Sequence, residues 1–134
     1  MDGVGIKAAS FFFPDKRQKT DTLEEYASLC SEEEIYRITF NNTGIKYIRE
    51  AGLMDATELA IAAASDLFKT SNIDRGDIDC VVYLQGRSPT YLMSSELTRL
   101  TNVLSIENAF SISLTDLGCV DISSALIIAK QFIE

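Results

Sequence analysis

The sequence contains no histidine and no tryptophan, and it has only two prolines and three cysteines among 134 residues. Without histidine, this chain alone cannot supply an imidazole as a general base or as a metal ligand. Cys30, Cys80 and Cys119 stand far apart and form no CxxC pair. Neither a disulfide framework nor a zinc or other metal site is therefore expected, and the thiols favour a reducing cytoplasm.

Long apolar runs are also missing. Runs such as residues 60–64 and 125–129 are short, whereas a membrane-spanning helix needs about 18 or more apolar residues. Asp2 and the charged stretch 15–17 interrupt any signal-peptide pattern at the start of the chain. With 46% hydrophobic and 24% charged residues, the composition is typical of one globular domain.

Basic residues are scarce. The sequence has 12 Lys and Arg against 20 Asp and Glu, which gives a net charge of −8. Nucleic-acid binding is disfavoured, since phosphate contacts need clustered Lys and Arg. The one basic cluster, Lys16, Arg17 and Lys19, is interpreted as a solvated loop rather than a binding patch. The acidic run between residues 21 and 34 indicates the exposed faces of helices.

The hydrophobic pattern predicts alternating strands and helices. Strands are expected at 4–13, 80–84 and 109–114, and helices at 23–30, from 31 to before 41, and at 54–70, 92–103 and 120–133. Strand 80–84 is apolar throughout, as is typical of a strand buried on both faces of a parallel sheet. The order β-α-β-α-β-α favours an α/β fold with a mainly parallel sheet and right-handed crossovers.

The last predicted helix is apolar almost all round, which predicts a central and buried position. Nothing after it in the sequence could cover it. We therefore expect the rest of a longer protein, or a tightly bound partner chain, to complete the fold.

A Gly118-Cys119 pair joins the third predicted strand to this helix. Unpaired amide groups at a helix start stabilise an anion, so the pKa of the Cys119 thiol should fall and the same amides could donate to an oxyanion. Gly118 permits a tight turn, whereas Asp116 and Asp121 would oppose thiolate formation if they faced the sulfur. A small cysteine that fills a helix–sheet junction is the simpler alternative, and position alone leaves both open.

The other candidate sites have weaker signals. Cys80 in a core strand and Cys30 near a helix end are expected to serve packing only. No GxGxxG sequence or P-loop is present, so no nucleotide cofactor is expected.

Several short pieces match one family in order and spacing. They are Val4-Gly5-Ile6 leading to Pro14, Thr43-Gly44-Ile45 with Arg49, residues 56–60, residues 78–83, Ser88-Pro89-Thr90-Tyr91, and residues 109–112 followed by Gly118-Cys119. Together they resemble the N-terminal half of thiolase-fold condensing enzymes, in particular the ketoacyl-acyl-carrier-protein synthase III branch.

The resemblance implies a thiolase-like domain of which residues 1–134 form the N-terminal part, incomplete without a C-terminal half. It assigns Cys119 as the acyl-accepting nucleophile, Gly118 to the oxyanion turn, and Arg49, Pro89 and Tyr91 to substrate binding. It implies no cofactor, and partners that are a C-terminal half supplying His and Asn, an acyl carrier protein or acyl-CoA, and a second thiolase-fold unit in a dimer. The activity implied is acyl transfer and condensation in fatty acid or polyketide biosynthesis.

Two other interpretations stay open at this point. The missing histidine and an irregular nucleophile turn favour a non-catalytic thiolase-fold subunit that shapes an active partner. A stand-alone flavodoxin-like binding domain is a third possibility.

Overall fold

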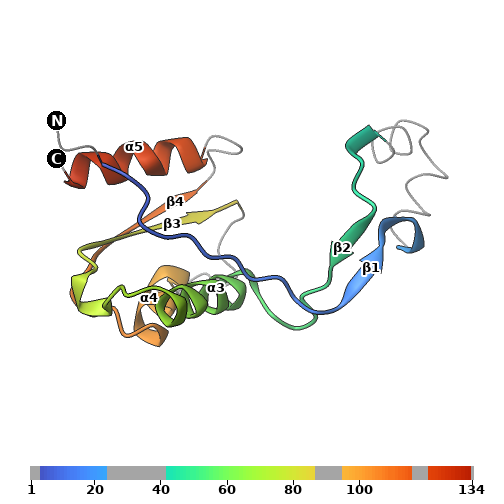
Figure 1. Cartoon of the computed structure of the whole chain (residues 1–134), viewed down its shortest axis with the longest axis horizontal. Helices are drawn as coiled ribbons and strands as arrows, with labels where there is room; N and C mark the ends of the chain where they lie inside the picture. The colour runs from blue at the N-terminus through green and yellow to red at the C-terminus, as the bar shows by residue number, and fades with distance from the viewer. Residues whose placement is uncertain (1–3, 24–41, 87–94, 116–120, 134) are drawn as a thin grey trace. The chain divides into compact units, whose positions relative to one another are not determined.

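The computed structural model describes residues 4–23, 42–86, 95–115 and 121–133. The chain divides into two compact units, one made of Met1–Phe12 with Ala56–Glu134 and the other of Phe13–Asp55 (Figure 1). The elements follow one another as β1 (Arg17–Lys19), η1 (Thr20–Thr22), β2 (Tyr47–Arg49), α3 (Ala56–Thr70), η2 (Arg75–Asp77), β3 (Cys80–Gln85), α4 (Glu96–Val103), β4 (Phe110–Thr115) and α5 (Asp121–Ile133).

A parallel pair of strands forms the centre of the first unit. β3 pairs with β4 from Cys80 opposite Phe110 to Gln85 opposite Thr115, which confirms both predicted strands and their parallel arrangement. The side chains of each strand alternate between the two faces. Figure 1 shows α3 and α4 on one face of the pair and α5 on the other, so both faces of these apolar strands meet helices.

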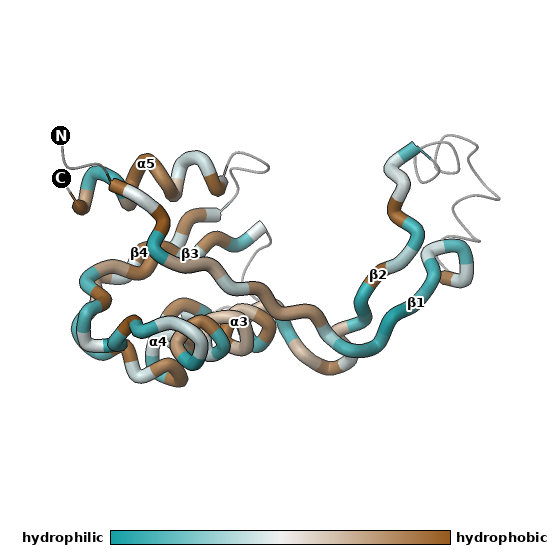
Figure 2. Tube along the Cα trace, in the orientation of Figure 1, coloured by the Kyte–Doolittle hydropathy of each residue, from teal (hydrophilic) through white to brown (hydrophobic). Residues whose placement is uncertain are grey.

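The hydrophobic core lies on the α3–α4 face. Its buried members come from β3, α4 and the turn that follows α4: Tyr83, Leu97, Leu100, Leu104 and Ile106. The alanine-rich side of α3, with Ala60 and Ala64, packs against them. Small side chains allow a helix to approach a sheet closely, and Figure 2 shows apolar residues along most of α3.

The ends of α4 follow from particular residues. The Ser95 hydroxyl accepts a hydrogen bond from the Thr98 amide at 3.2 Å and caps the first turn. At the other end, Ser105 has a φ of 56°, and the Ile106 amide donates to the Thr101 carbonyl at 2.9 Å. This left-handed ending is usually formed by glycine, so serine is strained there.

Helix α5 confirms the predicted last helix but not its burial. Ala125 is buried, and the Phe132 ring lies 5.6 Å from the Phe110 ring of β4, so one side packs on the sheet. Elsewhere on the helix, four large apolar side chains are exposed: Ile122, Leu126, Ile127 and Ile133. Burial of this helix was predicted only with a missing half or a partner chain in place, and no element of the described ranges covers these residues.

The predicted first strand is wrong, because residues 4–13 form no strand. In this segment the Ser10 hydroxyl donates a hydrogen bond to the Asp66 carboxylate of α3 at 3.1 Å. Ile6 and Phe11 remain exposed. The helices predicted at 23–30 and from 31 to before 41 fall on residues 24–41, outside the described ranges.

The second unit contains an antiparallel ribbon in which β1 pairs with β2. The buried Thr20 closes one end of the ribbon, because its hydroxyl donates to the Ile45 carbonyl at 2.8 Å. Arg17 and Lys19 of the basic cluster lie in a strand, so the interpretation of that cluster as a loop was wrong. Within the part of the chain that the structure describes, no helix has the length and apolar character to cross a membrane.

Candidate functional site

The carboxyl ends of β3 and β4 meet at one edge of the sheet. Gln85 lies opposite Thr115 in the register, so the chain leaves β3 toward residues 87–94 and β4 toward residues 116–120 from adjacent points. In open α/β sheets, ligands bind beyond the carboxyl ends of the strands. The segments 87–94 and 116–120, which carry predicted site residues, therefore follow strand ends that lie next to each other in the sheet.

Four of the predicted site residues lie outside the described ranges. Pro89 and Tyr91 fall in the first of these segments, and Gly118 and Cys119 fall in the second. Their roles stay predictions. The flanking elements are described: β4 ends at Thr115, and α5 begins at Asp121. In the sequence, Cys119 stands two residues before Asp121, the first described residue of α5, and the predicted effect on its thiol depends on amide groups at the start of that helix.

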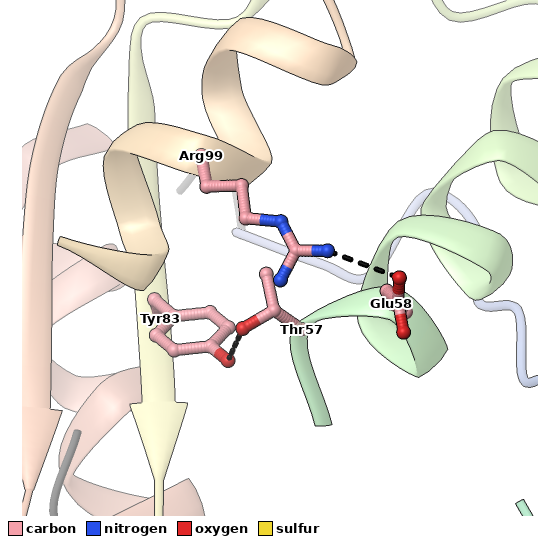
Figure 3. Close-up of polar contacts among 4 residues, drawn as sticks. All are labelled: Thr57, Glu58, Tyr83 and Arg99. Carbon is pink, nitrogen blue, oxygen red and sulfur yellow. Dashed lines mark hydrogen bonds and ion pairs between the residues drawn. The ribbon is translucent and has the colours of Figure 1, made fainter. Parts of the chain in front are cut away.

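A small polar layer fixes the helices that support this sheet (Figure 3). The hydroxyl oxygens of Thr57 and Tyr83 lie 3.3 Å apart in the protein interior and share one hydrogen bond. Beside them, Arg99 of α4 donates to Glu58 of α3 at 3.1 Å, in a half-exposed ion pair. The layer joins the first turn of α3 to β3 and α4 near the carboxyl end of β3. Because Thr57 bonds to Tyr83 and Glu58 bonds to Arg99, we interpret the layer as one that positions α3 and α4 on the sheet.

Sequence reasoning placed Thr57 in a predicted helix and Tyr83 in a predicted strand, and it gave neither hydroxyl a role in the site. Helix α3 begins at Ala56, so Asp55 stands at the cap position, and Thr57 is the most buried side chain described, at 1% exposure. The available signal was a tyrosine inside an aliphatic strand, because a buried tyrosine hydroxyl needs a hydrogen-bond partner.

Arg49 is the one predicted site residue that the structure describes. It lies on β2 in the second unit, and its Nη1 donates to the carbonyl oxygens of Pro14 at 3.3 Å and Asp15 at 2.9 Å. These bonds link β2 to the residues that precede β1. They satisfy part of the guanidinium without neutralising its charge.

Residues that could hold a metal do not gather in the described ranges, where no group of three or more Cys, Asp and Glu side chains has the required geometry. Cys80 is half-buried in β3, on the strand where a packing role was predicted. The described part of the site therefore consists of a sheet edge, a helix start and the polar layer behind them.

Comparison with known proteins connects this arrangement to a fold. No family model matches the chain, and no curated protein matches it. Among solved structures, it is similar to a ketoacyl-acyl-carrier-protein synthase III from Thermus thermophilus, with 21% identity, a TM-score of 0.72, and coverage of 96% of this chain and 38% of that one.

Two further structures give the same result. The acyltransferase ChlB3 is 16% identical with a TM-score of 0.71, over 92% of this chain and 36% of its own. A 3-oxoacyl-acyl-carrier-protein synthase III is 24% identical with a TM-score of 0.68, over 92% of this chain and 35% of its own. The chain thus has the thiolase-like fold of these enzymes and spans little more than a third of their length.

Proposed function

We propose that this chain provides the nucleophile-bearing part of a ketoacyl synthase III-like acyltransferase, in which Cys119 accepts an acyl group from a thioester. The observation that supports this most is the alignment of 92–96% of the chain with condensing and acyl-transferring enzymes. The position of Cys119 between β4 and α5 is consistent with it.

In the proposed first step, the Cys119 thiolate attacks the carbonyl carbon of an acyl thioester. A new carbon–sulfur bond forms, the donor's carbon–sulfur bond breaks, and the donor thiolate leaves and takes up a proton. Amide groups at the start of α5 would stabilise both the thiolate and the oxyanion of the tetrahedral intermediate. Gly118 would allow the acyl carbon to approach the backbone closely.

In the second step, the resemblance implies that a malonyl-type thioester loses carbon dioxide to form a carbanion. The carbanion attacks the acyl-Cys119 carbonyl, a carbon–carbon bond forms, and the Cys119 thiolate is released. Proton handling and carbanion stabilisation would need His and Asn side chains, and this chain contains no histidine. Pro89, Tyr91 and Arg49 are proposed to contact the substrate.

The outer face of α5 supports the proposal that a complementary half completes the site. Ile122, Leu126 and Ile133 follow one another by four and seven residues, so they share one side of the helix, and all three are exposed. A stripe of this spacing fits the apolar face of another helix. We propose that a second thiolase-fold half, on the same protein or on a partner chain, covers this stripe and supplies the His and Asn.

Intact-mass measurement tests the nucleophile. The protein that carries this sequence, together with its complementary half, is incubated with an acyl thioester, and one acyl group per chain is expected. Cys119→Ala should abolish the adduct, whereas Cys80→Ala, which changes a half-buried thiol in β3, should retain it. An adduct that persists in Cys119→Ala, with turnover unchanged, would contradict the proposal.

The alternative function, a non-catalytic subunit of a heteromeric synthase, is favoured by the absence of histidine. Alkylation of Cys119 at a series of pH values separates the two functions. A catalytic thiol should react with an apparent pKa well below the ordinary value of about 8.5. A reactivity midpoint at or above that value would favour the non-catalytic subunit.

A further inference from the structure

One face of the β1–β2 ribbon carries four exposed side chains: Arg17, Lys19, Tyr47 and Arg49. The other face carries Gln18 and Ile48, which are half-buried. Because side chains alternate along each strand, the exposed set shares one side of the ribbon. We call these four residues the cationic face.

The register places Arg17 directly opposite Arg49. Backbone hydrogen bonds join Glu50 to Lys16 and Thr20 to Lys46, and hydrogen-bonded and non-hydrogen-bonded pairs alternate along an antiparallel ribbon. The Arg17–Arg49 pair is therefore of the non-hydrogen-bonded kind, in which facing side chains come closest, with Cβ atoms about 4.5–5.5 Å apart. Like charges at such a site destabilise the ribbon.

Within the described ranges, no ion pair joins Arg17 or Arg49 to a carboxylate. Glu50 forms an ion pair with Lys16, and Asp15 meets Arg49 through its backbone carbonyl at 2.9 Å. In the part of the chain that the structure describes, these two opposed guanidinium groups therefore have no carboxylate partner, although the net charge of the sequence is −8.

Each guanidinium is held by a contact that leaves donors available. The Arg17 Cζ lies 3.5 Å from the centroid of the Tyr47 ring, and such stacking occupies the plane of the group but not its N–H edges. Arg49 uses Nη1 for its two carbonyl bonds, so Nη2 and Nε remain. The two groups are thus positioned before any ligand arrives, which lowers the entropy lost on binding.

We infer that the cationic face binds the phosphate group of a small molecule. Guanidinium N–H forks match the geometry of phosphate oxygens and bind them with paired, charge-assisted hydrogen bonds. Three cationic side chains suit a ligand with two or more negative charges, and the Tyr47 hydroxyl adds a neutral donor at the same face. The inference concerns the second unit alone and does not depend on Cys119. It shares Arg49 with the proposed substrate contacts, so its test uses Arg17 and Lys19.

Titration with inorganic pyrophosphate, followed by ³¹P NMR at low ionic strength, tests this site. Saturable binding is expected, with affinity reduced about tenfold or more in Arg17→Gln and in Lys19→Gln, since a hydrogen bond to a charged group contributes roughly 1.5–3 kcal/mol. Arg75→Gln is the matched control, because Arg75 also stacks on an aromatic ring, with Cζ 4.8 Å from the Phe68 centroid, but belongs to the first unit.

The control separates a specific site from bulk charge. Unchanged affinity in Arg75→Gln together with weakened binding in both ribbon variants would support the site. Equal losses in all three variants, or no saturable binding by the native protein, would overturn it. A parallel titration with glycerol 3-phosphate distinguishes the ligand: tighter binding of pyrophosphate indicates a diphosphate, and equal binding indicates a single phosphate group.

Discussion

The hydrogen bond between Thr57 and Tyr83 gives a sharp test of how the first unit is held together. Thr57 is 1% exposed and Tyr83 is 8% exposed, and in the described part of the chain each hydroxyl has the other as its one hydrogen-bond partner. Removing one partner leaves a buried hydroxyl unsatisfied, which costs about 1–3 kcal/mol. The 3.3 Å separation is longer than usual for two hydroxyl oxygens, so the bond itself is weak.

We therefore expect Tyr83→Phe to lower the free energy of unfolding by about 1–2 kcal/mol. Thr57→Val should lower it less, because the Tyr83 hydroxyl lies at the end of a long side chain and can turn toward water more easily. The double variant removes both hydroxyls and keeps the apolar shape, so its stability should lie within about 0.5 kcal/mol of the native protein.

Equilibrium urea unfolding of the four proteins measures this cycle. The two single changes should couple by about 1 kcal/mol or more, because the residues are in contact. Strictly additive effects with an unchanged m-value would refute the reasoning, since they would show that neither hydroxyl depends on the other. An altered m-value would indicate a change in the unfolded or native ensemble instead.

Two further predictions concern α4 and α5. Ser105→Gly should raise the free energy of unfolding by about 0.5–1 kcal/mol in urea unfolding, because glycine adopts the φ of 56° without strain; Ser105→Val should lower it, and a stabilising valine would contradict this account. Leu126→Glu should change the free energy of unfolding by less than about 0.5 kcal/mol, because Leu126 is exposed, yet reduce the fluorescence of a bound apolar dye. Ser123→Glu, also exposed on α5, is the control and should leave the dye signal unchanged; equal signals in both variants would contradict an apolar docking stripe.

Much of the fold could be predicted from local patterns. The apolar character of residues 80–84 and the strand pattern of residues 109–114 identified β3 and β4. Regular spacing of apolar residues identified α3 and α4, and an almost wholly apolar composition identified α5. Such patterns can be read from sequence because the spacing of apolar residues along an element shows which of its faces is buried. The strand predicted at 4–13 failed because β-forming residues specify an extended chain but not a partner for its backbone.

One part of the candidate site could also be recognised from the sequence, and another part could not. A glycine followed by a cysteine, between a strand and a helix, can be recognised from sequence, because the chemistry depends on neighbours along the chain. The Thr57–Tyr83 bond could not be recognised, because its two hydroxyls are 26 residues apart and meet only when α3 packs on β3.

By itself the sequence determined the order of α3, β3, α4, β4 and α5, the absence of any imidazole, and a Gly-Cys pair between a predicted strand and a predicted helix. The tertiary structure decided which charges and hydroxyls face one another. It placed Arg49 opposite Arg17, residues that stand 32 positions apart in the chain (49 − 17), and it left one side of α5 exposed. The physical reason is that hydrophobic periodicity fixes which way a side chain points within its own element, whereas its partner depends on strand register and helix packing that no local pattern encodes.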